Sequence, residues 1–288
     1  MDDICLREKV TLTRTEALAL IKKHGINPKK SLGQNFVVEP NSIRQIVGIA
    51  EIEPNDFVLE VGPGLGSLTR SLLEASKHVT VIEVDETLVT VIKDSLEGYN
   101  EKLQIIHADV MDLDLERVLI ARNENWNLVA NLPYNIAVPL ICEFLEKVTS
   151  ISKMTVMVQR EVADRLVAKA GQKAYGLPSL KVEYYAEVKK IVDVPPTVFL
   201  PKPKVESSIV QIERRENKIT TDADILFGLA KQAFNQRRKM LRKSLKEVLD
   251  SDDFDASAVD SMIRAEDVTL DNWVSLTRQF VNKQDKSK

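Results

Sequence analysis

The chain of 288 residues is poor in the residue types that bind metals and form disulfides, with two cysteines and three histidines. Cys5 and Cys142 have no further Cys or His nearby at ligand spacing, so we expect no metal site and no disulfide. Such cysteine usage fits a reducing compartment. The sequence also lacks a secretory signal and a long apolar segment, which predicts a soluble, cytoplasmic protein that does not bind membranes.

The chain also has no excess of positive charge, because its 40 Lys and Arg are outnumbered by 43 Asp and Glu, which gives a net charge of −3. Taken as a whole, this balance predicts neither nucleic-acid nor membrane binding. The distribution along the chain says more than the sum. Residues 231–246 carry basic side chains without any acid, and residues 247–271 reverse the balance. At 44% hydrophobic residues, the chain can form one large core and a smaller second domain.

Strand-like and helical segments alternate through the first part of the chain, which predicts a parallel sheet with right-handed crossovers. The predicted strands are 57–61, 78–82, 103–107, 126–130 and 153–158. The predicted helices are 14–24, 40–50, 67–75, 86–96 and 136–148. Later in the chain the alternation stops, and 222–246 and 256–281 have wholly helical patterns. We expect an α/β, Rossmann-like doubly wound domain over 1–214, with a helical extension over 1–50, and a small all-helical domain over 215–288.

The tetrad Asn131-Leu132-Pro133-Tyr134 is the most informative motif. It follows the predicted strand 126–130, so it lies at the carboxyl edge of the sheet, where ligands bind in open α/β folds. The Asn131 amide oxygen and the Leu132 carbonyl can accept hydrogen bonds from an exocyclic amino group. Pro133 makes the turn rigid, and the Tyr134 ring can stack on the base. The tetrad therefore indicates a site that holds a nucleobase by its amine.

Three other strand ends carry residues that suit a nucleotide-type cofactor. The turn Gly62-Pro63-Gly64-Leu65-Gly66 lets the backbone approach a ligand closely. Glu83 can accept the hydroxyls of a ribose, and Asp109 can accept a hydrogen bond from an adenine amine. Alone, the glycine turn fits either a dinucleotide or an S-adenosylmethionine loop. Its last glycine comes two residues after Gly64 rather than three, which favours the second.

The motifs resemble those of the ribosomal RNA adenine N6,N6-dimethyltransferases that act on the small subunit. The resemblance runs from about residue 29 to about residue 280, and it rests on segments 31–36, 62–66, 131–134, 195–207 and 233–239. It implies a Rossmann-like class I methyltransferase domain with a mixed, mostly parallel seven-stranded sheet. It further implies S-adenosylmethionine as cofactor, with S-adenosylhomocysteine as product. The implied cofactor contacts are Asn35, Val37, Gly62, Gly64, Glu83, Asp109 and Asn131.

The resemblance also implies a reaction, dimethylation of the N6 amine of two adjacent adenosines in a hairpin loop near the 3′ end of small-subunit (16S) ribosomal RNA. The resemblance also implies a role in small-subunit biogenesis. The implied partners are this RNA and an immature 30S-type particle, and the protein is expected to be a monomer. Catalysis would depend on orientation and electrostatics, with no metal. The expected catalytic residues are Asn131, Leu132, Pro133, Tyr134 and Phe199, with the Phe199 ring covering the second face of the adenine.

Basic residues near these motifs are expected to bind RNA phosphates. The spacing of Lys239, Arg242, Lys243 and Lys246 predicts one face of a helix, and the lack of nearby acids favours phosphate binding over a merely solvated face. The predicted RNA-binding residues are Lys29, Lys30, Lys202, Lys204, Arg237, Arg238, Lys239, Arg242, Lys243 and Lys246.

Three alternatives remain open at this point. Large-subunit rRNA methyltransferases that confer macrolide resistance share the catalytic core, although segments 195–207 and 236–239 look more like the small-subunit group. A non-catalytic nucleic-acid-binding relative, such as the mitochondrial transcription factors of this fold, is opposed by the intact tetrad and glycine loop. A nicotinamide oxidoreductase would leave the tetrad without a purpose.

Overall fold

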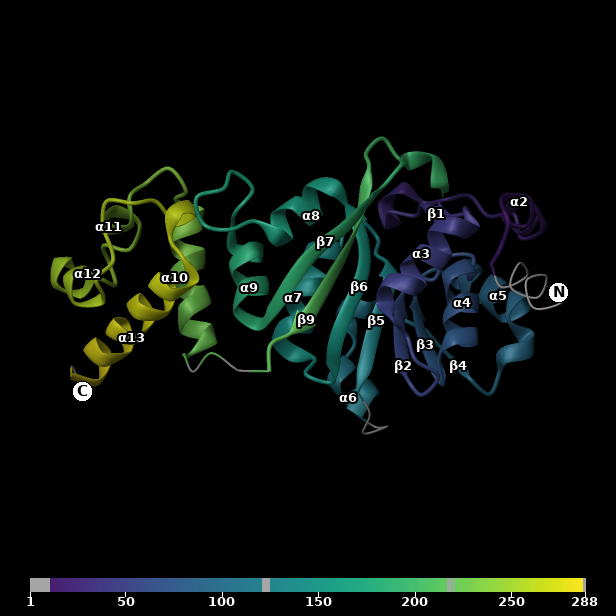
Figure 1. Ribbon diagram of the computed structural model, residues 1–288, viewed down its shortest axis with the longest axis horizontal. Helices are drawn as coiled ribbons and strands as arrows, with labels where there is room; N and C mark the ends of the chain where they lie inside the picture. Colours follow the sequence, from purple (N-terminus) through teal and green to yellow (C-terminus); the bar gives the residue numbers. More distant parts are fainter. Residues whose placement is uncertain (1–10, 121–124, 217–218, 220, 287–288) are drawn as a thin grey trace. The chain divides into compact units, whose positions relative to one another are not determined.

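The computed structural model describes residues 11–120, 125–216, 219 and 221–286, which form two compact units (Figure 1). The first unit holds the described residues up to Ala163 together with Lys189–Glu213. The second holds Asp164–Val188 and the described residues from Arg214 onward. No helix in these described parts combines the length and the apolar character that a membrane crossing requires. Cys142 is buried. Cys5 lies outside the described residues, so the expectation that the two cysteines form no disulfide stays a prediction.

Within the described residues, seven strands form one sheet in the order β4-β3-β2-β5-β6-β9-β7. Neighbours among β2 to β6 pair in parallel, and β9 runs antiparallel to β6. The prediction of a mixed, mostly parallel seven-stranded sheet is therefore confirmed. The strands are β2 (Phe57–Val61), β3 (His78–Glu83), β4 (Leu103–His107), β5 (Trp126–Asn131), β6 (Ile151–Gln159), β7 (Ala186–Val194) and β9 (Ser207–Arg214).

The winding of the chain reverses between β2 and β5. From β2 the chain runs through α4 (Ser67–Ala75) to β3 and through α5 (Glu86–Ser95) to β4. It returns through α6 (Leu115–Ile120) to β5 on the other side of β2, and α7 (Ala137–Lys147) leads on to β6. Right-handed crossovers then place α4 and α5 on one face and α6 and α7 on the other. The reversal creates a crevice at the carboxyl ends of β2 and β5.

Local sequence signals explain where several of these elements begin. Helix α2 (Arg14–Lys23) starts with a capping box between Thr13 and Glu16, and Pro40 opens α3 (Pro40–Ala50) at its first turn. Asp85 caps α5 by accepting a hydrogen bond from the Thr87 amide at 3.1 Å. Short segments complete the unit: η1 (Lys30–Leu32), η2 (Glu97–Tyr99), η3 (Val110–Asp112) and η4 (Pro196–Val198), with β1 (Phe36–Val37) pairing antiparallel to β8 (Phe199–Leu200).

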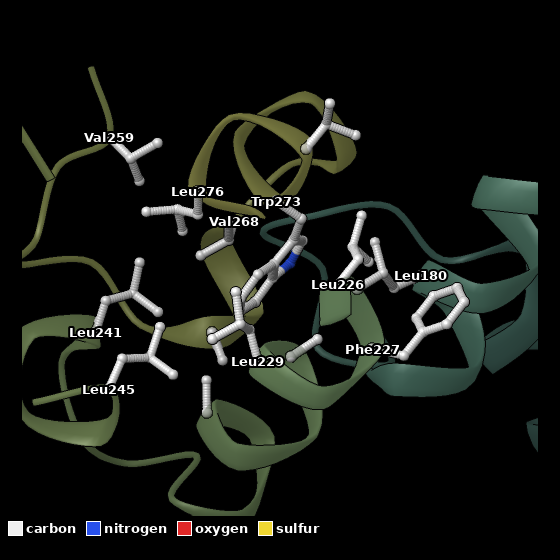
Figure 2. Close-up of a cluster of buried hydrophobic side chains, with 14 of the residues drawn as sticks. Leu180, Leu226, Phe227, Leu229, Leu241, Leu245, Val259, Val268, Trp273 and Leu276 are labelled. Atoms are coloured by element: carbon white, nitrogen blue, oxygen red, sulfur yellow. The ribbon is translucent and has the colours of Figure 1, made fainter. Parts of the chain in front are cut away.

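The second unit is helical and is built around Trp273, which is completely buried. Figure 2 shows its indole among the side chains of Leu226, Leu229 and Val268. The helices are α9 (Leu177–Tyr185), α10 (Ala223–Asn235), α11 (Leu241–Ser244), α12 (Ser251–Ser257), η5 (Ala265–Asp267) and α13 (Leu270–Lys286), and the end of α8 (Arg160–Val167) also belongs here.

Two sequence expectations differ from this arrangement. The sequence pattern predicts that residues 164–188 belong to the first domain. In the structure they pack with the C-terminal helices, since Tyr175 and Leu180 belong to the same buried cluster as Trp273. The prediction that 222–246 and 256–281 are wholly helical is wrong. Helix α10 ends at Asn235, and Met240 is extended and forms a β-bridge with Arg264. Tertiary pairing overrides a local helical pattern there, since no Gly or Pro marks the break.

We predict that Leu226→Ala lowers the free energy of unfolding of the second unit by about 2–5 kcal/mol, because it removes a fully buried side chain and leaves a cavity. The measurement is urea unfolding followed by Trp273 fluorescence in a Trp126→Phe background. Met262→Ala is the control, since Met262 is 46% exposed in the same unit and should change stability by less than about 0.5 kcal/mol. Equal effects of the two substitutions would contradict the core assignment.

Candidate functional site

A pocket opens in the first unit at the carboxyl ends of β2, β3, β4 and β5, where the winding reverses. It encloses about 810 Å³ when the space at its open mouth is included. Every residue that the sequence predicted to contact the cofactor lines it, namely Asn35, Val37, Gly62, Gly64, Glu83, Asp109 and Asn131.

The backbone of the glycine loop lies so close to two other segments that there is no room for a side chain on the loop. Gly64 has φ +60°, and a Cβ added there would lie 2.7 Å from the ring of Phe36. Gly62 has φ +69°, and a Cβ there would lie 3.2 Å from the ring of Pro133. Only glycine allows both this conformation and this proximity. The loop therefore brings the 31–37 segment and the tetrad to the same pocket.

The pocket is acidic. Among the described residues that line it, Glu60, Glu83 and Asp109 carry carboxyl groups, and none is Lys, Arg or His. Burial, with a smaller contribution from the neighbouring Glu83, raises the pKa of Glu60 to about 8. Burial also raises the pKa of Glu83, against hydrogen bonds from backbone amides that lower it. Such a lining has no basic side chain that would repel a positively charged ligand, and it offers no cation to the pyrophosphate of a nicotinamide dinucleotide.

The Asn131 side chain is oriented by the chain segment opposite it. Its Nδ2 donates a hydrogen bond to the Asn35 carbonyl at 2.9 Å. Its Oδ1 is buried at the pocket and accepts no hydrogen bond from the described residues. A flipped amide would place Oδ1 against the Asn35 oxygen, which is repulsive. Oδ1 is therefore a buried acceptor with no donor among the described residues.

The segment 29–35 is tied to the Glu83 side of the pocket through Asp85. Lys29 Nζ and Gln34 Nε2 lie 2.8 Å and 3.0 Å from Asp85 Oδ2. Although burial opposes it, these hydrogen bonds lower the pKa of Asp85. The Asp85 amide in turn donates to Glu83 Oε1 at 2.9 Å. Lys29, predicted as an RNA contact, thus forms an ion pair beside the cofactor pocket.

The catalytic residues predicted from the sequence differ in their accessibility. Leu132 is buried, Pro133 lines the pocket, and Tyr134 is half-buried with its hydroxyl 2.7 Å from Ser207 Oγ. Phe199 is only 1% exposed, and it lies in β8 opposite Val37 of β1. A base can stack on the Phe199 ring only after its surroundings move.

The predicted RNA-binding residues also have different environments. Arg237 donates to Glu266 Oε2 at 2.7 Å and to the Lys173 carbonyl at 2.8 Å, so it stabilises its own unit. The single helical face predicted for Lys239 to Lys246 is wrong, because α11 spans only Leu241–Ser244. The side chain of Lys30 lies outside the described atoms. The remaining candidates are exposed: Lys202, Lys204, Arg238, Lys239, Arg242, Lys243 and Lys246.

Sequence reasoning missed three polar residues of this region, Glu60, Asp85 and Ser207. Glu60 carried a usable signal, since an acid inside the apolar run Phe57–Val61 is unusual for a buried strand. The partners of Asp85 and Ser207 come from distant parts of the chain, so no local pattern marks them. Among the described residues, no group of His, Cys, Asp and Glu side chains could hold a metal ion.

Comparison with known proteins agrees with this geometry. The sequence profile named "Ribosomal RNA adenine dimethylase" matches residues 25–286. The chain belongs to this family. It is 35% identical to the "Ribosomal RNA small subunit methyltransferase A" of Alkaliphilus metalliredigens, over 92% of the chain and 96% of the relative. It is 41% identical to the protein of the same name from Mycobacterium sp. strain KMS, over 93% and 95%.

A solved structure with a similar fold is the dimethyladenosine transferase from Plasmodium falciparum. Its TM-score is 0.73 at 25% identity, with 85% of this chain and 97% of that chain covered. Membership of the adenine dimethylase family confirms the resemblance that the motifs indicated. The small-subunit names of the relatives favour the small-subunit enzyme over the large-subunit alternative.

We predict that Glu60→Gln changes how the stability of this adenine dimethylase depends on pH. The raised pKa means that the folded state holds the Glu60 proton between pH 4.5 and about 8, where the unfolded state has released it. The wild type should therefore lose roughly 1.4 kcal/mol per pH unit from this group as pH rises through that window, and Glu60→Gln should not.

The measurement is urea unfolding of the ligand-free protein at pH 5, 6.5 and 8. The advantage of Glu60→Gln over the wild type should grow with pH. Glu97→Gln, which changes an exposed glutamate, is the control. A constant difference between Glu60→Gln and the wild type would contradict the buried, protonated carboxyl.

Proposed function

We propose that this enzyme transfers methyl groups from S-adenosylmethionine to the N6 amines of two adjacent adenines in small-subunit ribosomal RNA, twice on each base. The observation that carries the proposal is the orientation of Asn131. Its Nδ2 is held by the Asn35 carbonyl, and its buried Oδ1 is free to accept an N–H from an exocyclic amine.

Holding the amine by its protons solves a chemical problem. The nitrogen lone pair of adenine is conjugated into the ring, which makes the amine a poor nucleophile. Acceptance of its two N–H bonds by Asn131 Oδ1 and the Leu132 carbonyl favours a pyramidal nitrogen with its lone pair directed away from the ring. Pro133 fixes the direction of the chain at this point, and Tyr134 stacks on the base. The contribution of the protein is orientation and electrostatics.

The acidic pocket fits the proposed methyl donor. S-adenosylmethionine supplies an electrophilic methyl group on a positively charged sulfur. A carboxylate at Glu83 favours that positive charge, no Lys, Arg or His of the lining opposes it, and the glycine loop lets a ligand lie close to the backbone. In this proposal, Glu83 accepts the ribose hydroxyls and Asp109 the adenine amine, as at other α/β strand ends.

The substrate RNA is proposed to contact two exposed basic groups. Lys202 and Lys204 lie in the loop after Phe199, and Arg238, Lys239, Arg242, Lys243 and Lys246 lie around α11. We propose that the preferred substrate is an immature 30S-type particle and that the enzyme acts as a monomer. Phe199 would cover the second face of the adenine once its ring is uncovered.

We predict that Asn131→Ala and Tyr134→Ala each lower methyl transfer at least a hundredfold, since each removes a group that orients the amine. The assay uses labelled methyl donor and 30S particles that lack the modification, with mass spectrometry of the product adenosines. Asn127→Ala is a matched control on the same strand, because Asn127 donates to Asp56 Oδ2 at 3.2 Å, away from the pocket. Near-normal turnover by Asn131→Ala would refute the proposed function.

We predict that the double substitution Arg242→Ala with Lys243→Ala weakens particle binding and lowers the slope of log K against log salt by roughly one to two. Both side chains are exposed next to α11 residues that are buried. Lys147→Ala serves as the control, because Lys147 lies 2.8 Å from Glu143 in α7. An unchanged salt slope would exclude phosphate contacts at α11.

A further inference from the structure

Tyr134 is held by a residue from a different strand. The Tyr134 hydroxyl lies 2.7 Å from Oγ of Ser207, the first residue of β9, and Ser207 is completely buried. In the sheet, β6 lies between β5 and β9. Because β9 is antiparallel to β6, with Ser207 opposite Gln159, the start of β9 meets the carboxyl ends of β5 and β6. The hydrogen bond therefore spans β6 at the edge where the tetrad lies.

The position of Ser207 is itself fixed by its neighbours. Glu206 accepts a hydrogen bond from the Arg160 amide at 3.0 Å, and its carboxylate pairs with the Arg160 guanidinium at 2.6 Å. The Ser207 hydroxyl is thus presented to Tyr134 from a rigid strand end. Burial raises the pKa of Tyr134, so its phenol keeps its proton at neutral pH.

We propose that Ser207 is a positioning residue for methyl transfer, which holds the Tyr134 ring in the direction that the adenine needs for stacking. This inference rests on the proposed function, in which Tyr134 stacks on the base. The phenol oxygen lies on the long axis of the ring, so a hydrogen bond to it fixes the direction of that axis. A phenylalanine at 134 would keep the stacking surface and lose this constraint.

The second methyl transfer depends on the Tyr134–Ser207 hydrogen bond more than the first transfer does. An unmodified adenine amine offers two N–H bonds to Asn131 Oδ1 and the Leu132 carbonyl. After one methyl transfer a single N–H is left, and one acceptor loses its donor. The base is then oriented by one hydrogen bond and by its contact with Tyr134. A loosely held ring should therefore slow the second methylation selectively and leave N6-monomethyladenosine.

The experiment compares Ser207→Ala, Tyr134→Phe and their combination in the full-length enzyme acting on unmethylated 30S particles. Digested RNA is analysed for mono- and dimethyladenosine in single-turnover time courses, and S-adenosylmethionine affinity is measured by titration. We expect each single substitution to slow the second transfer about tenfold, the worth of one hydrogen bond. The first transfer should slow less, and cofactor affinity should change less than about twofold, because neither residue belongs to the acidic lining.

The double substitution should be no slower than the slower single one, because both remove the same hydrogen bond. Ser207→Thr keeps a hydroxyl and should restore dimethylation. Ser208→Ala is the matched control, since Ser208 is the next residue, is equally buried and loses a hydrogen bond to Asp193 instead. It should dimethylate like the wild type.

Wild-type product ratios in either Ser207→Ala or Tyr134→Phe would overturn the inference, as would additive effects in the double variant. If Ser207→Ala fails to fold, Tyr134→Phe tests the same hydrogen bond from its other end. An inactive Asn131→Ala together with a normal Ser207→Ala would defeat this inference and leave the proposed function intact. An active Asn131→Ala would defeat the proposed function itself.

Discussion

The hydrogen bond from Asn131 Nδ2 to the Asn35 carbonyl is the interaction on which the site depends. It joins the end of β5 to a segment that lies 96 residues earlier in the chain. The same bond decides which amide atom faces the pocket, and so it decides whether Asn131 can receive a donor there. Without this bond the side chain could rotate, and the acceptor that the chemistry requires would be lost.

The topology of the sheet explains why these parts meet. Reversal of the winding between β2 and β5 leaves one crevice, and the loops after both strands must open into it. Gly62 and Gly64 then allow the loop after β2 to approach Pro133 and Phe36 without a side chain between them. In the proposed function, one edge of the sheet serves two ligands, because the loops that hold the cofactor and the turn that holds the base come from adjacent strands.

Much of this could be predicted from local pattern, and the failures share a physical cause. Strand β2 and the turn that follows it are determined by neighbouring residues, so the hydrophobic pattern and the glycine spacing predict them. The break after Asn235 and the ion pairs of Lys29 and Arg237 depend on partners far away in the sequence. The same is true of the Tyr134–Ser207 pair, which spans 73 residues. The sequence shows where basic residues cluster, but only the structure shows which of them already form ion pairs within the protein.

The carboxyl groups of the pocket also bear on how a turnover ends. Giving up a methyl cation turns a sulfonium into a neutral thioether, so the spent molecule carries one positive charge fewer than the fresh one. Beside a carboxylate at Glu83, which is only 5% exposed, that lost charge weakens attraction more than it would in water. In the proposed reaction, the pocket therefore holds the charged donor more strongly than its neutral product, which favours exchange of the product for a new donor.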